Sequence, residues 1–147
     1  MKISVRMADA TDREELKDFY SREGLDFEDI MTRTAPTFSH SETMYIVAEA
    51  QGMIVAALRL SIGREPGVGK VGIIQYFEIE DELEQTELGP NMLSEAVQIA
   101  EDKGLRALDT MVRDDRTEVI ELYKDAQFEI DHKETYLRRK FRKRLFT

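Results

Sequence analysis

The sequence predicts an α/β (α+β) fold in which a single mixed β-sheet is flanked by helices. Three observations carry this prediction. Residues near the N-terminus and in the middle of the chain alternate apolar and polar side chains, as half-buried strands do. Other segments repeat their apolar residues at helical spacing. The two kinds of segment are interleaved along 147 residues, a length that suits one domain spanning residues 1–147.

The N-terminal half predicts a strand, two helices and a hairpin. Asp9 or Thr11 can cap the first helix, and Gly24 can terminate it. The pair Gln51-Gly52 separates two runs that are rich in β-formers, which predicts a tight hairpin turn. The expected elements are a strand at residues 3–7, helices at 9–21 and 27–33, a loop at 35–41, and strands at 44–50 and 53–62.

The C-terminal half predicts further strands and two longer helices. Residues 63–70 look like a phosphate-binding P-loop, but the first glycine is one residue early and Val71 replaces the Ser or Thr, so a hairpin loop is expected. Pro90 suits a first helical turn, and Asp115 with Glu118 resembles a capping box. The expected elements are strands at 71–79 and 105–112, helices at 88–103 and 115–126, and last strands at 128–130 and 135–141.

Composition and charge exclude several classes of function. No run approaches the length of a membrane span, and the N-terminus lacks the apolar region of a signal peptide, so we expect a soluble, cytoplasmic protein. The chain has no cysteine, which excludes disulfides and thiolate chemistry. Its net charge of −9 makes nucleic acid an unexpected partner.

One segment has the opposite charge. Residues 133–144 contain seven Lys or Arg and a single acid, Glu134. We interpret this segment as a folded edge strand guarded by its charges, with Tyr136 and Phe141 as apolar anchors. A contact surface for a polyanion is the alternative.

The stretch from Val71 to Asp102 carries the most functional information. An apolar strand enters a loop with Gly89-Pro90, and an amphipathic helix follows at once. Such a junction aims free backbone N–H groups at the strand end, where they can bind an anion. Yet this stretch contains nine Asp or Glu and no Lys or Arg. The geometry predicts a phosphate-bearing ligand, whereas the charge opposes one.

The element order and two local sequences resemble the GNAT superfamily of acyl-CoA-dependent N-acyltransferases. Residues 79–84, leading to Leu88-Gly89, resemble the end of the family's fourth strand and its pyrophosphate loop Q/R-x-x-G-x-G/A. Residues 118–128 resemble its A-I-x-L-Y-x-K-x-G-F segment. Glu84 replaces the family's Gln or Arg, Glu87 replaces the first glycine, and Gln127 replaces the glycine before the phenylalanine.

The resemblance implies roles for individual residues. Backbone groups from Phe77 to Ile79 would align the pantetheine and polarise the thioester, and loop N–H groups from Leu83 to Gly89 would hold the pyrophosphate. The cofactor-binding residues expected on this basis are Phe77, Ile79, Glu84, Leu88, Gly89, Pro90 and Arg116.

Two side chains are candidates for proton transfer. Tyr123 occupies the position of the tyrosine that protonates the departing sulfur, although it also lies on an apolar helical stripe and suits a core tyrosine. Glu78 can act as a general base, directly or through water, or be a surface carboxylate. Neither His40, in the predicted loop, nor His132 has helix-spaced partners, so no metal is expected. His40 stays a candidate for the substrate cleft.

Two functions follow from the resemblance. The first is an N-acetyltransferase that moves an acetyl or related acyl group from coenzyme A to an amine of a small molecule or peptide, with acyl-CoA and the amine as partners. The second is a catalytically weak or inactive GNAT-fold module that acts through a protein partner. A homodimer is compatible with both.

Overall fold

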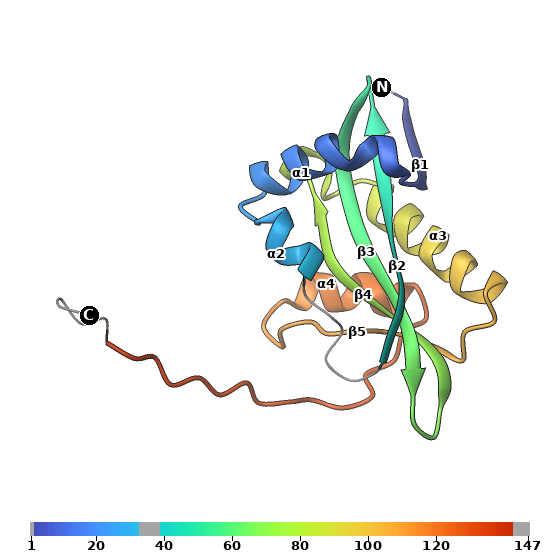
Figure 1. Cartoon of the computed structure of the whole chain (residues 1–147), viewed down its shortest axis with the longest axis vertical. Helices are drawn as coiled ribbons and strands as arrows, with labels where there is room; N and C mark the ends of the chain where they lie inside the picture. Colours follow the sequence, from blue (N-terminus) through green and yellow to red (C-terminus); the bar gives the residue numbers. More distant parts are fainter. Residues whose placement is uncertain (1, 33–38, 143–147) are drawn as a thin grey trace.

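Five strands in the described part of the chain form one mixed sheet in sequence order. The computed structural model describes residues 2–32 and 39–142 (Figure 1). Neighbouring strands β1 to β4 are antiparallel, and β5 is parallel to β4. The strands are β1 (Ile3–Met7), β2 (Ser39–Ala50), β3 (Met53–Glu65), β4 (Gly69–Ile79) and β5 (Ala107–Thr110).

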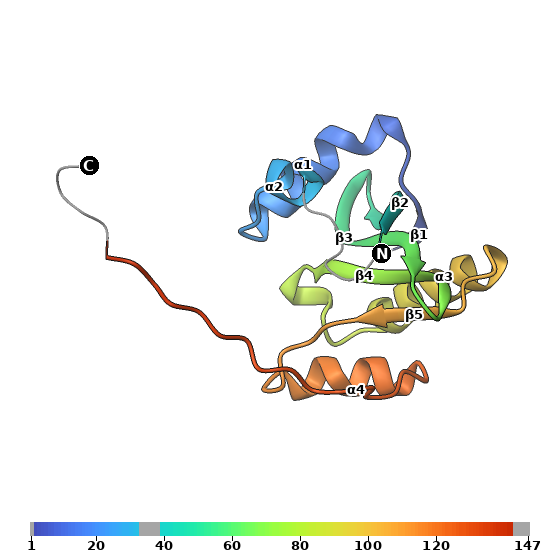
Figure 2. The same ribbon diagram turned by 60° about the horizontal axis from the view of Figure 1, so that its bottom comes forward.

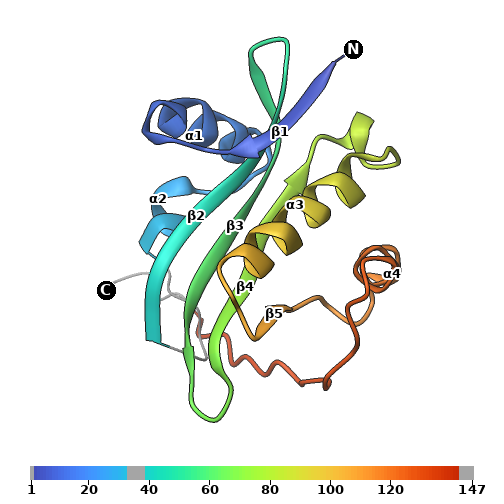
Figure 3. The same cartoon turned by 90° about the vertical axis from the view of Figure 1, so that its right-hand side faces the viewer.

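Helices cover both faces of the sheet, which confirms the predicted fold class. Figure 3 shows α1 and α2 on one side of the strands and α3 on the other. Strand β3 is buried on both faces because its side chains alternate between the two helical layers. The helices are α1 (Arg13–Arg22), α2 (Phe27–Thr32), α3 (Leu88–Asp102) and α4 (Thr117–Asp125), with short 3₁₀ turns η1 (Ala10–Asp12) and η2 (Asp81–Leu83).

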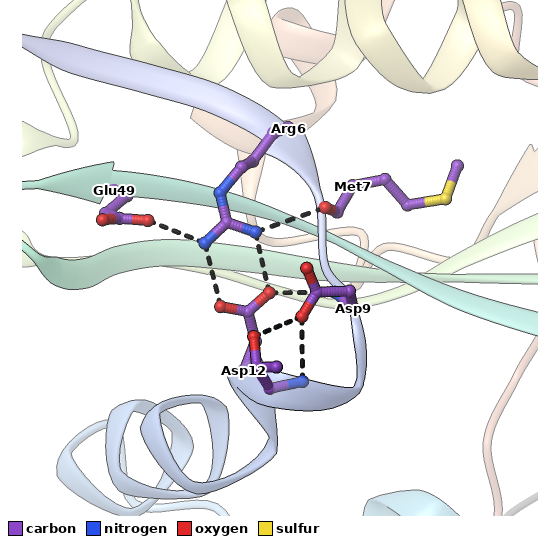
Figure 4. Close-up of polar contacts among 6 residues, drawn as sticks. Arg6, Met7, Asp9, Asp12 and Glu49 are labelled. Atoms are coloured by element: carbon purple, nitrogen blue, oxygen red, sulfur yellow. Dashed lines mark hydrogen bonds and ion pairs between the residues drawn. The ribbon is translucent and has the colours of Figure 1, made fainter.

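A group of hydrogen bonds around Arg6 holds the connection between β1 and α1 in place (Figure 4). The guanidinium of Arg6 donates two hydrogen bonds to Asp12, of 2.7 and 2.8 Å, and one of 2.7 Å to Glu49 on β2. Asp9 accepts from the backbone of Thr11, as the cap prediction required. Arg6 lowers the pKa of Asp12 to about 2. The cluster therefore ties the first helix to the sheet.

Strand β4 extends beyond the end of its neighbour β5. Their ladder covers four residue pairs and stops at Ile74 and Thr110, whereas β4 continues to Ile79. A bulge interrupts β4 there, since Tyr76 and Phe77 together lie opposite a single residue of β3 and Tyr76 has a φ of 52°. The second half of β4 thus has a strand partner on one side only.

The predicted C-terminal strands are wrong. Residues 128–130 and 135–141 carry no strand in the structure, and Tyr136, Leu137 and Phe141 are 80, 85 and 81% exposed. Figure 2 shows the segment leaving α4 and extending away from the sheet. The β-forming residues were identified correctly, but a strand also needs an edge that it pairs with, and this chain does not fold back onto one. Tyr136 and Phe141 are therefore not anchors to this chain's core.

Three smaller expectations need correction. Residues 39–41 belong to β2 and not to a loop, while residues 33–38 lie outside the described part. The hairpin loop is shorter than 63–70, because β3 runs to Glu65 and β4 starts at Gly69. Asp115 and Glu118 form no capping box, since Arg116 is the N-cap residue of α4 and makes no side-chain cap bond.

Candidate functional site

The second half of β4, which pairs with β3 alone, forms one wall of the candidate site. Residues 75–79 lie beyond the end of the β5 ladder, so among the described residues no strand pairs with their outer edge. Phe77 and Ile79 pack toward the core that α3 and α4 cover. Backbone groups on such an open edge can pair with an extended ligand as they would with a strand.

The first turn of α3 forms the second wall. A methyl group on Gly89 would lie 3.5 Å from both terminal methyls of Leu122 on α4, and 3.6 Å from the Cδ1 of Ile79. Glycine at this position therefore lets the beginning of α3 approach both α4 and the end of β4. The site is the place where these three elements meet.

Backbone N–H groups without a partner occur in the loop that leads into this junction. Within residues 2–32 and 39–142, the N–H groups of Gln85, Glu87 and Gly89 make no hydrogen bond. The N–H of Leu88 donates to the Thr86 hydroxyl at 3.3 Å, and Pro90 has no N–H to offer. Free donors at the start of a fifteen-residue helix suit an anionic group such as a pyrophosphate.

The acidic side chains of the loop face solvent. Glu82, Glu84 and Glu87 are all exposed. Their carboxylates therefore do not occupy the backbone donors, although their charge still opposes an anionic ligand. This arrangement reduces the conflict between geometry and charge without removing it.

Tyr123 reaches the point where β4 and β5 separate. Its side chain is 6% exposed and packs edge-on against Phe128, with ring centroids 5.1 Å apart. Burial raises the pKa of Tyr123, and a hydrogen bond with the Thr110 hydroxyl acts in the opposite direction. Thr110 is the last residue of the ladder and donates to the carbonyl of Ile74 at 3.1 Å. We call the point where β4 and β5 separate the fork. Tyr123 is thus both a core residue and a protonated phenol at the fork.

Glu78 lies on the other face of the sheet, toward α1. Burial raises its pKa, and the nearby carboxylates of Glu23 and Glu84 act in the same direction, whereas Arg116 opposes them. Burial also raises the pKa of Glu23, and nearby acids including Glu84 add to the shift. A carboxylate with a raised pKa is a better proton acceptor than an ordinary surface glutamate.

Arg116, the basic residue expected to bind the cofactor, lies close enough to Glu78 for its charge to act on that carboxylate. It is exposed at the start of α4.

Two members of this constellation were not identified from the sequence. Glu23 follows α1 directly, and Thr110 ends β5, and neither belongs to a motif. Glu23 lies 55 residues before Glu78 in the sequence, and Thr110 lies 13 residues before Tyr123. No local pattern predicts that the fold brings the members of each pair together. His40 lies in β2, but its side chain is outside the described part.

An unusual arginine lies deeper on the α1 face. Arg59 is 1% exposed and donates to the Ile30 carbonyl and, at 2.6 Å, to the Gln75 side chain. The ring of Tyr76 stacks 4.8 Å from its guanidinium carbon. These contacts hold the β4 bulge against β3 and so shape the strand that forms the site.

The described residues contain neither a metal-binding cluster nor a membrane-spanning helix. No group of three or more His, Asp or Glu is close enough to hold a metal ion. No helix is both long and apolar enough to cross a membrane.

Comparison with known proteins agrees with this geometry. The family model described as "Acetyltransferase (GNAT) family" matches residues 7–128. No curated protein sequence matches the chain.

Solved structures share the fold at low sequence identity. The aminoglycoside N-acetyltransferase AAC(6')-Iy in complex with CoA has a TM-score of 0.72 and 15% identity, over 94% of this chain and 100% of that one. An acetyltransferase from Trypanosoma brucei has a TM-score of 0.71 and 17% identity, over 93% and 99%. Glucosamine-6-phosphate N-acetyltransferase from Arabidopsis thaliana has a TM-score of 0.70 and 14% identity, over 97% and 100%.

Proposed function

We propose that this chain, which belongs to the acetyltransferase (GNAT) family, transfers an acetyl or related acyl group from coenzyme A to an amine. The observation that carries the proposal is the fork between β4 and β5, which opens beside the free N–H groups of the α3 junction. A thioester in the fork would have its pyrophosphate within reach of these donors.

Different residues around the fork would bind different parts of acyl-CoA. The backbone of Phe77 and Ile79 would align the pantetheine as an added strand aligns, and the N–H groups of Glu87 and Gly89 would hold phosphate oxygens. The loop also contains Glu84, Leu88 and Pro90, and none of these side chains carries a positive charge that could bind a phosphate. Acyl-CoA is the cosubstrate and supplies an activated carbonyl.

Proton transfer would use both faces of the sheet. As the amine nitrogen bonds to the carbonyl carbon and the carbon–sulfur bond breaks, Glu78 accepts the amine's proton, directly or through one water. Tyr123 gives its proton to the departing sulfur. Because Glu78 lies toward α1 and Tyr123 lies in the α3 layer, amine and thiol can occupy opposite sides of the fork.

The charges beside Glu78 favour a cationic acceptor. The charges of Glu23 and Glu84 both raise the pKa of Glu78, and the charge of Glu84 also raises the pKa of Glu23, which means that negative charge is concentrated there. A second positive charge on the amine substrate would reduce this repulsion. A cationic small molecule or a basic peptide fits this electrostatic pattern.

The test is amine-dependent release of free thiol from acetyl-CoA. We expect release with an amine panel, and faster release with dicationic amines than with neutral-tailed amines of equal length. Glu78→Gln should slow turnover strongly, whereas the exposed control Glu101→Gln on α3 should not. Thiol release that does not depend on any amine would refute the proposal.

A further inference from the structure

A buried positive charge lies on the sheet face that α1 and α2 cover. Arg59 on β3 is 1% exposed, and it belongs to none of the ion pairs among the described residues. Its two hydrogen-bond partners, the Ile30 carbonyl and the Gln75 amide oxygen, are uncharged. Burial of a charge without an opposite charge is costly, which makes this arginine a candidate for binding an anion from outside the protein.

Three polar atoms at this place are buried without a hydrogen-bond partner in the described part of the chain. They are the Tyr45 hydroxyl, the Arg59 Nε and the Ser61 hydroxyl. Tyr45 lies directly opposite Arg59 in the β2–β3 ladder, and Ser61 is two residues further along β3 on the same face. Only one other such atom occurs in the described part, a carboxylate oxygen of Glu15. Because buried polar atoms are normally paired, three together indicate a binding site.

The proposed base lies on the same face, one step along the sheet. Glu78 pairs with Ala57 on β3. Two residues further on, Arg59 pairs with Gln75, and this spacing corresponds to about 7 Å along an antiparallel strand. The phenol of Tyr20 lies near both charges, since burial raises its pKa, Glu78 adds to this shift and Arg59 opposes it. The base and the buried cation therefore share one surface.

The chemistry of the unpaired atoms selects the kind of ligand. The Arg59 Nε and the two hydroxyls can each donate a hydrogen bond, and an oxyanion can accept all of them. The acids Glu23 and Glu84 both act on Glu78, so negative charge is already present nearby. A doubly charged phosphate would meet more repulsion there than a singly charged carboxylate. The site therefore suits a carboxylate.

We propose that Arg59, Tyr45 and Ser61 form a subsite for a carboxylate at the far end of the amine that is acylated. The inference rests on the proposed function and narrows the acceptor to an amine whose carboxylate lies several carbon atoms away, as in free lysine. The side-chain amine of such a molecule meets Glu78 while its carboxylate meets Arg59. Its second amine supplies the additional positive charge that the surrounding acids favour.

The carboxylate enters this subsite past α2. That helix has six residues and covers Arg59 through the Ile30 carbonyl. Tyr45, Gln75 and Tyr76, which surround the guanidinium, are only half-buried. A small outward movement of α2 uncovers the guanidinium, and the oxygens of the ligand then replace the carbonyl as acceptors.

The first test compares acceptors that differ at the carboxylate. They are free lysine, lysinamide, which carries a neutral amide instead, and cadaverine, which lacks the group; each is assayed by thiol release from acetyl-CoA. We expect lysine to have a KM about tenfold or more below the other two, the usual scale for hydrogen bonds to a charged group. The same amines are titrated by calorimetry with and without coenzyme A, so that binding is measured independently of acylation.

The second test uses two variants that remove a hydroxyl and nearly keep the size of the side chain. Ser61→Ala and Tyr45→Phe should each raise the KM for lysine by about tenfold and so abolish its advantage over cadaverine. Neither should lower the melting temperature, because neither hydroxyl has a partner within the described chain. Ser94→Ala on α3 is the matched control, since that serine is exposed and lies across the sheet, and it should keep the preference for lysine.

The outcomes separate the subsite from the activity. Equal KM values for lysine, lysinamide and cadaverine would overturn the subsite while the proposed activity stands. A preference for lysine that survives both variants would also overturn it, because the two hydroxyls would then be structural. If no amine is acylated, tighter calorimetric binding of lysine than of lysinamide, lost in Ser61→Ala, would support the subsite and refute only the activity. Equal binding, or none, would refute both.

Discussion

Replacing Tyr123 by Phe separates its catalytic role from its packing role. Phenylalanine keeps the ring that lies 5.1 Å from Phe128 and removes only the hydroxyl, with its hydrogen bond to Thr110. One such bond contributes about 1 kcal/mol to stability. For a chain of this length that corresponds to a fall in melting temperature of about 2–4 °C.

The effect on catalysis should be much larger. If Tyr123 protonates the leaving sulfur, turnover of an accepted amine should fall by about 10²-fold or more, with acetyl-CoA affinity nearly unchanged. The assays are thermal unfolding, calorimetric titration and thiol release. Tyr136→Phe is the control, because that tyrosine is 80% exposed in the segment after α4 and the variant should keep full activity. A clear loss of melting temperature with activity intact would mean that Tyr123 is purely structural, and the acid assignment would be withdrawn.

Three other perturbations have defined outcomes. Glu84→Arg with Glu87→Gly should strengthen acetyl-CoA binding in calorimetry, because it removes two like charges from the α3 junction; equal affinity would mean that the phosphates bind elsewhere. The raised pKa of Glu78 should place the acidic limb of the pH–rate profile above the ordinary glutamate range, and Glu78→Gln should abolish that limb rather than shift it. Asp12→Asn should lower the free energy of unfolding by about 1 kcal/mol near neutral pH, after allowance for the solvent exposure of Arg6. Because the pKa of Asp12 is lowered from 3.8 to about 2, the difference between the variant and the parent should shrink as pH falls through that interval. A difference that does not depend on pH would refute the ion-pair account.

Local patterns predicted most of the fold correctly. Strand β1 was bounded correctly at both ends, and α3 was placed from Pro90 and its apolar spacing, because these features depend on neighbouring residues. The turn at Gln51 and Gly52 followed from turn chemistry alone, and both residues have positive φ. Such signals are encoded within a few positions of the chain.

The errors arose where an element depends on a distant partner. Residues 135–141 contain the composition of a strand, but composition does not say which edge the strand pairs with, or in which molecule. In the same way, the sequence suggested Glu78 and Tyr123 but gave no sign that Glu23 and Thr110 lie beside them.

Titration of acetyl-CoA into the protein by calorimetry, at low and at moderate salt, tests the central claim most directly. The fork and its free N–H groups predict saturable binding at one site per chain. Because the exposed carboxylates of the loop repel an anionic ligand, affinity should rise as salt increases from low to moderate. The absence of any binding heat at millimolar acetyl-CoA, at both salt levels, would contradict the account and leave the chain as a GNAT fold without its cosubstrate.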